Sequence, residues 1–257
     1  MPTMPDYESW PIVALLRPDL LKDRLDKAIP FCASDEARPI LTSVHIEAKE
    51  KGLTFGAANN YVVVGTDLDA VVEAPGVSAN VPAVTLKLLA SLVADDTVAY
   101  RVNSNRPEVA FTFDNYVFIS RAIDGMYPNY EQVLPSFSAW DGEAGSYGVT
   151  VDRKSLLKAL KLSRKDDIVR LVTGPDALAV EIRDGVSALF AKSIPATVNP
   201  VRDEVSAFNP TLLTLALNSI SASTVTLFRN SPDVNHVLGI DTGDPQFRYA
   251  VMPVKVS

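Results

Sequence analysis

Basic side chains recur at a regular spacing early in the second half of the chain. Four lysines stand at i, i+4, i+7 and i+11: Lys154, Lys158, Lys161 and Lys165. A helix would place them in one narrow stripe. Arg153 and Arg164 extend the basic group, and no acid lies between 153 and 165. The stripe creates a positive field that suits phosphates, with no means of reading base edges. A solvated lysine-rich face remains an equal alternative for this helix taken alone.

A few other residues could take part in chemistry. Asp67 and Asp69 would lie on one face of a strand and could bind a divalent cation, although solvated acids are the preferred interpretation. His45 and His236 lie far apart, so a histidine metal site is not expected, and structural roles are assigned to both. Cys32 is expected to be a small buried side chain. The sequence has no glycine-rich phosphate loop, nucleophile elbow or HExxH motif, and therefore no familiar catalytic signature.

The composition is that of a globular protein with a sizeable core. Of 257 residues, 47% are apolar and 21% charged, and the net charge is −7. A single cysteine excludes an internal disulfide. The longest uncharged stretch, 205–228, contains Asn209, Pro210 and Asn218 and does not qualify as a membrane span. The start of the chain is acidic and lacks the features of a signal peptide. We therefore expect a soluble, cytoplasmic protein.

The charge divides the chain into two halves. Residues 1–140 hold 11 basic and 18 acidic side chains, whereas residues 141–257 hold 13 of each. A loop-like stretch, 135–148, lies at the change, so two domains are expected, 1–140 and 141–257.

Periodicity predicts an α+β fold with few helices and many strands. The expected helices are Pro18–Ile29, Pro82–Val93, Asp152–Lys165 and Pro210–Ile220. Prolines 82 and 210 are placed at first helical positions, with Asp152 and Asn209 as N-caps. In the first half the expected strands are 44–48, 53–57, 61–73, 97–102, 109–113 and 116–122. In the second half they are 148–151, 168–173, 178–183, 186–194, 224–229, 234–240 and 247–256. Each half is therefore interpreted as helix, strands, helix, strands, and a weak repeat with an offset of about 128 residues supports two domains of one topology.

Two segments resemble a known family. Residues 123–135 read IDGMYPNYEQVLP, and residues 249–256 read YAVMPVKV. The first is similar to the segment that closes the middle domain of the bacterial DNA polymerase sliding clamp, the beta subunit of the replicative polymerase. The second is similar to the end of that family's last domain. Weaker similarity in residues 38–57 and 208–227 extends the resemblance across both halves.

The resemblance implies a DNA clamp fold and a function in DNA replication. Such clamps are rings and processivity factors without enzymatic activity or cofactor, and they tether a DNA polymerase and meet a clamp loader. Family members have three domains per chain and close as dimers. Since this chain has room for two domains, a six-domain ring implies a homotrimer. The family's helices line the central hole, so the lysine stripe would face duplex DNA, with Arg24, Lys27 and Lys87 as secondary contacts.

The resemblance also implies a groove for a short peptide containing glutamine and leucine or phenylalanine. In the first domain the implied groove residues are Leu41, Ala58, Asn60, Tyr61, Val62, Val63, Pro128, Gln132 and Val133. In the second they are Val251, Met252, Pro253 and Val254. The family usually has a Gly-His-Arg-Leu turn where this chain has residues 60–63, which changes the polar rim of the groove.

Two alternatives remain open at this point. The first is a clamp-like interaction protein that binds peptides without encircling DNA, favoured by the acidic first half and by Asp23 and Asp26, which interrupt the basic face of the first helix. The second is an enzyme that uses Asp67 and Asp69 with a divalent cation.

Overall fold

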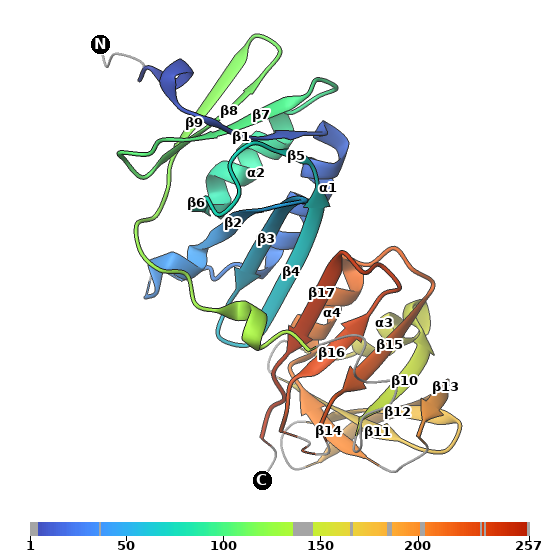
Figure 1. The fold of residues 1–257 in the computed structure, drawn as a ribbon. Helices are drawn as coiled ribbons and strands as arrows, with labels where there is room; N and C mark the ends of the chain where they lie inside the picture. The colour runs from blue at the N-terminus through green and yellow to red at the C-terminus, as the bar shows by residue number, and fades with distance from the viewer. Residues whose placement is uncertain are drawn as a thin grey trace. The chain divides into compact units, whose positions relative to one another are not determined.

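One order of elements occurs twice along the chain, as Figure 1 shows. The computed structural model describes residues 5–35, 37–135, 146–164, 167–183, 187–200, 204–231, 233 and 235–255. Residues 1–60 with 64–130 form one compact unit, and residues 61–63 with 131–257 form the other. The boundary expected after residue 140 falls within 136–145, outside the described residues, whereas the compact units divide after Tyr130.

The first unit contains helices α1 (Pro18–Ala28) and α2 (Ala83–Leu92). Its strands are β1 (Ile12–Leu16), β2 (Ser43–Lys49), β3 (Gly52–Ala58), β4 (Val62–Asp69), β5 (Val71–Val72), β6 (Ser78–Pro82), β7 (Val98–Val102), β8 (Glu108–Phe113) and β9 (Tyr116–Arg121). Short 3-10 turns are η1 (Tyr7–Ser9), η2 (Ile29–Phe31), η3 (Pro39–Thr42) and η4 (Tyr130–Gln132).

Two antiparallel layers make up this unit, with orders β5-β1-β7-β8-β9 and β4-β3-β2-β6. The helices contact each other, and α1 packs on β3 while α2 packs on β6. Leu21 and Leu25 are fully buried because the apolar residues of α1 recur at helical spacing on one face. Pro82 is the N-cap of α2 rather than its first helical residue, since its backbone is still extended as the end of β6.

The second unit repeats this plan. Its helices are α3 (Arg153–Leu160) and α4 (Pro210–Asn218), and its strands are β10 (Tyr147–Asp152), β11 (Ile168–Thr173), β12 (Ala177–Arg183), β13 (Ala188–Asn199), β14 (Val205–Phe208), β15 (Thr224–Arg229), β16 (Leu238–Asp241) and β17 (Phe247–Val251). The long strand β13 pairs with β12 through its first part and with β10 through its last residues. It thereby connects the layer β14-β11-β12-β13 to the layer β13-β10-β15-β16-β17.

The α+β fold with two helices per unit agrees with the sequence, but several elements differ from the prediction. Strands β1, β6 and β14 were not predicted, so the first unit has an unpredicted strand before α1, whereas β10, which precedes α3, was predicted as 148–151. The predicted strand 61–73 is two strands, β4 and β5, and β17 ends at Val251 rather than at 256. The helix predicted to reach residue 165 ends at Leu160, where Ser163 donates from both its amide and its hydroxyl to the Leu160 carbonyl.

Candidate functional site

Helix α3 presents exposed lysines because its opposite face is fixed in the core. Asp152 caps the helix by accepting a hydrogen bond from the Ser155 amide at 2.7 Å. Hydrogen bonding to Ser155 lowers the pKa of the Asp152 carboxyl below its ordinary value. The helix buries its leucines and leaves Lys154 and Lys158 exposed. A two-turn segment thus carries charge on one side and apolar packing on the other.

The predicted lysine stripe is shorter than expected. Lys161 is exposed but stands at the C-cap, and Arg164 lies beyond the helix, where its backbone amide donates to Asp167 at 2.6 Å. Lys165 lies outside the described residues. In the part of the chain that the structure describes, no carboxylate forms an ion pair with Lys154, Lys158 or Lys161. These three lysines therefore place positive charge at the surface, with Asp152 close enough to Lys154 for the two charges to interact.

Arg153 differs from these lysines. Its half-buried side chain donates from Nε to the Ala222 carbonyl at 2.7 Å and from Nη1 to the Leu217 carbonyl at 2.9 Å. These carbonyls lie at and beyond the end of α4, where backbone acceptors lack helical partners. Arg153 therefore joins the two helices of its unit, and its predicted contact with DNA competes with this structural role.

The helices of the first unit offer less free positive charge. Arg24 is only 5% exposed and forms an ion pair with Asp23 at 3.0 Å, while Lys27 pairs with the same carboxylate at 3.1 Å. One carboxylate, that of Asp23, thus pairs with both basic side chains. On α2, Lys87 is exposed beside a row of exposed apolar side chains, Val84, Leu88 and Leu92.

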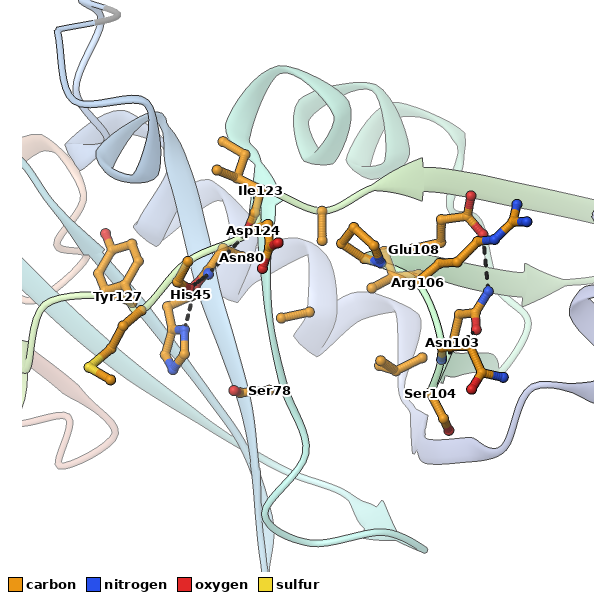
Figure 2. A pocket seen from close by; sticks show the side chains of 18 residues that line it. His45, Ser78, Asn80, Asn103, Ser104, Arg106, Glu108, Ile123, Asp124 and Tyr127 are labelled. Atoms are coloured by element: carbon orange, nitrogen blue, oxygen red, sulfur yellow. Dashed lines mark hydrogen bonds between the residues drawn. The ribbon is translucent and has the colours of Figure 1, made fainter.

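The segment that follows β9 is held against β2 and β6 by a polar and aromatic network (Figure 2). The Asn80 amide donates from Nδ2 to the carbonyls of Ile123 and Gly125 at 3.2 and 2.9 Å. The Asn80 Oδ1 must then be the acceptor in its 2.7 Å contact with Nδ1 of His45, so Nδ1 carries the proton. The His45 ring stacks on Tyr127 with centroids 5.1 Å apart. His45 therefore has the structural role that the sequence predicts.

The same network positions Pro128, a predicted groove residue. Tyr127 accepts a hydrogen bond from the Ala58 amide at 3.1 Å, and Tyr130 packs against Gly56. Pro128 lies between these two anchored tyrosines and is exposed. A cavity of about 600 Å³ lies beside the network, bounded by β6, the β7–β8 connection and residues 122–127. Figure 2 shows Asn103 and Glu108 paired on its other side, at 3.0 Å.

The remaining groove residues of the first unit show a buried floor and a polar edge. Leu41 and Ala58 are 5% and 6% exposed. The side chain of Asn60 accepts a hydrogen bond from Arg38 at 3.1 Å. Arg38 was not among the predicted groove residues. The one sequence signal that could have identified it is its position in the segment 38–57, which is similar to the family.

The other predicted groove residues belong to the second unit. Val62 and Val251 are buried, Val63, Pro253 and Val254 are half-buried, and Tyr61, Gln132, Val133 and Met252 are exposed. The amide of Met252 donates to the Tyr61 carbonyl at 2.8 Å, and the amide of Val254 donates to the Ala207 carbonyl at 2.7 Å. The segment after β17 is thus fixed by its backbone, with the Met252 side chain 41% exposed.

Nothing in the described residues supports a cation site at Asp67 and Asp69. Asp67 accepts a hydrogen bond from the Thr54 hydroxyl at 2.9 Å. Within the described residues, no group of three or more His, Cys, Asp or Glu side chains is placed to hold a metal ion. Cys32 is half-buried, and burial raises the pKa of its thiol to about 12. His236 is exposed in a turn. Among the helices of the described chain, none is both long and apolar enough to cross a membrane.

Comparison with known proteins gives this arrangement a context. Residues 16–129 match the family model described as the central domain of the DNA polymerase III beta subunit. The chain resembles bacterial sliding clamps. It is 28% identical to the beta sliding clamp of Synechococcus elongatus over 239 residues, which cover 87% of this chain and 60% of that one. With the beta sliding clamp of Streptococcus pneumoniae it shares 23% identity, over 95% of this chain and 64% of the relative. The chain thus spans less than two thirds of the length of these relatives.

Solved structures establish the DNA clamp fold. The DNA polymerase sliding clamp of Bacillus subtilis superposes with a TM-score of 0.87 at 19% identity, covering 100% of this chain and 67% of that one. The beta subunit of DNA polymerase III from Pseudomonas aeruginosa gives 0.87 at 20% identity, covering 99% and 69%. At these identities the superpositions show the fold alone.

Proposed function

We propose that this chain is a DNA sliding clamp, a ring-shaped processivity factor that encircles duplex DNA and tethers a polymerase in the cytoplasm. The observation that carries this proposal is the exposed set Lys154, Lys158 and Lys161 on a helix of a clamp fold. Their charges are free to attract phosphates without fixing a sequence, as sliding requires. In this role the protein is not an enzyme, because it holds its partners together and changes no bond.

The lysines provide the test of DNA encirclement. Replacing all three with glutamate removes and reverses exposed charge, so folding should survive while retention of the loaded protein on circular DNA falls. In a plot of the logarithm of the DNA-binding constant against the logarithm of the salt concentration, the slope should become less steep by about 0.9 for each phosphate that the protein no longer neutralises. Lys49→Glu, Lys51→Glu and Arg106→Glu make a control of equal charge change, since these side chains are exposed and lie outside the helices, although Lys49 also loses an ion pair with Glu47. Equal retention by the two triple variants across a salt series would refute the assignment.

The free sheet edges support a trimeric ring. In the described first unit, β9 ends its sheet, and Tyr116 on it is 60% exposed. In the second unit, residues 188–195 of β13 pair only with β12 among the described strands, and Leu189 there is 54% exposed. Unpaired edges favour strand addition, and two different edges make a head-to-tail contact that can close a ring.

The mass of the assembly tests this closure. Three chains of 27.8 kDa give about 83 kDa in native mass spectrometry. Tyr116→Lys adds a charge at the β9 edge and should shift the population toward monomer, whereas Tyr61→Lys, at a residue outside both edges, should not. A wild-type monomer that persists at tens of micromolar would contradict the trimer.

Partner binding is the second part of the proposal. The exposed Met252 and Tyr61 and the buried Val62 and Val251 combine an apolar base with accessible anchors, which suits a short apolar peptide. A fluorescein-labelled peptide of sequence Gln-Leu-Ala-Leu-Phe has the residue types that the resemblance implies and serves as the probe. The partners expected to carry such peptides are the polymerase and the clamp loader.

One observation favours the alternative of a clamp-like protein that binds peptides without encircling DNA. Arg24 is buried, and the exposed face of α2 is largely apolar, so the helices of the first unit contribute little free positive charge. Loading on primed circular DNA separates the two functions. Peptide binding without retention on the circle, even at low salt, would support the alternative.

A further inference from the structure

Arg229 is a fully buried charged residue at the end of β15. Its Nη1 forms an ion pair with the carboxylate of Glu204, which is 7% exposed. The guanidinium carbon also lies 5.8 Å from the centre of the Phe208 ring. Glu204 immediately precedes β14 and Phe208 is the last residue of that strand, which lies in the other layer of the unit. One side chain thus joins β15 to both ends of β14.

Strand β14 lies at the end of its sheet, with Phe208 fully buried. It is four residues long, and in the described sheet only β11 pairs with it. At its start, the Glu204 amide donates to the Thr173 hydroxyl at 2.8 Å, and the Thr173 amide donates to the Glu204 carbonyl at 3.0 Å. Glu204 therefore anchors this strand through its backbone as well as through its side chain.

The other edge of β14 holds the segment after β17. The Ala207 carbonyl accepts the hydrogen bond from the Val254 amide at 2.7 Å. Ala207 lies in the middle of the stretch whose ends Arg229 contacts. Any shift of β14 would therefore move the acceptor that fixes Val254, two residues from the exposed Met252.

The chemistry of the ion pair indicates a geometric rather than a stabilising role. Among the described residues, Nε and Nη2 of Arg229 have no hydrogen-bond partner. Burying a charged group with unpaired donors is costly, and apolar residues of similar volume usually replace such pairs without loss of stability. A charged pair does, however, accept only a few relative positions of its two strands.

We propose that Glu204 and Arg229 are positioning residues for the peptide groove, because they fix β14 and, through Ala207, the Met252–Val254 segment. This inference rests on the proposed peptide binding for its functional consequence. Its structural part, the coupling of the buried pair to Val254, stands independently of any ligand.

The decisive variant is the double replacement Glu204→Met with Arg229→Leu, which keeps the volume and removes both charges. We expect it to remain folded, with the Leu227 amide in the central strand β15 exchanging with solvent as in the wild type. The Val254 amide should exchange about tenfold faster, since local opening is governed by local contacts. Affinity for the Gln-Leu-Ala-Leu-Phe probe should fall about fivefold, as when one groove residue is displaced from its ligand. Asp176→Asn, which removes an exposed acid in the turn between β11 and β12, is the control and should change neither value.

The two readouts keep this inference distinct from the proposed function. Wild-type protection of Val254 and wild-type probe affinity in the folded double variant would overturn the positioning role. Faster Val254 exchange with no probe binding to any protein, wild type included, would support the coupling and refute the peptide groove. If the double variant fails to fold, Arg229→Lys keeps the charge but not the fork of donors, and unchanged Val254 exchange in it would equally overturn the inference.

Discussion

Gly56→Ala tests how residues 123–130 are held within the first unit. A Cβ at residue 56 would lie 2.2 Å from Cζ and 2.3 Å from Cε1 of Tyr130, far inside van der Waals contact. The Tyr130 ring is 5% exposed and has Tyr127 against it at a centroid distance of 6.0 Å, so it has little room to withdraw. Overpacking of this kind costs about 1–3 kcal/mol. We expect the free energy of unfolding in urea to fall by that amount.

A double-mutant cycle identifies the cause of this destabilisation. Tyr130→Leu removes the ring that the new methyl group would meet, so Gly56→Ala should cost little in that background, with a coupling of about 1 kcal/mol or more. Gly174→Ala is the matched control because its Cβ would be 3.7 Å from the Ala177 carbonyl oxygen, an ordinary contact. The reasoning is refuted if Gly56→Ala costs less than about 0.5 kcal/mol, the range of neutral surface changes, or costs the same in both backgrounds.

Two further predictions concern single side chains. Met252→Ala should weaken binding of the Gln-Leu-Ala-Leu-Phe probe by about 1–2 kcal/mol, because an exposed apolar anchor is removed, whereas Met126→Ala, at a 94% exposed methionine outside the predicted groove, should leave it unchanged; equal affinity for both variants in fluorescence anisotropy would count against the groove. Cys32, whose pKa burial raises to about 12, should react with iodoacetamide at pH 8 at least about tenfold more slowly in the folded protein than in urea, because less of the thiol is ionised, and equal rates in the two conditions would contradict the raised pKa.

Much of the fold could be predicted because local signals mark the elements. Asn209 and Asp152 cap α4 and α3 as predicted, and the leucines of α3 face the core. The predicted end of α3 was wrong because the run of basic residues continues past Leu160. The helix ends where the hydroxyl and the amide of Ser163 donate to the Leu160 carbonyl, a contact that the run of charges does not indicate. Strand β14 was missed since its four residues lie in a long uncharged stretch without alternation.

The site was less predictable than the fold, because tertiary contacts decide what a charge does. The spacing of Lys154 and Lys158 correctly predicts a shared exposed face on α3. The basic residues predicted to contact DNA also include Arg153, which donates to carbonyls near the end of α4, and Arg24, which is buried beside Asp23. The groove residues came from the resemblance alone, and their role stays a prediction. The ion pair between Glu204 and Arg229 was missed, since nothing in the sequence near either residue indicates a charged partner on a distant strand.

The contrast between Arg153 and the lysines beside it has a consequence for how this protein can change. Arg153 is tied to the α4 carbonyls, so its replacement disturbs the packing of both helices. Lys154, Lys158 and Lys161 are exposed, and within the described residues their side chains form no hydrogen bond or ion pair. Selection, or a designer, can therefore adjust the attraction of this face for a polyanion in single charge steps while the free energy of folding stays nearly constant. The charge on the exposed face of α3 can therefore vary while the packing of the helix, held by Arg153, stays the same.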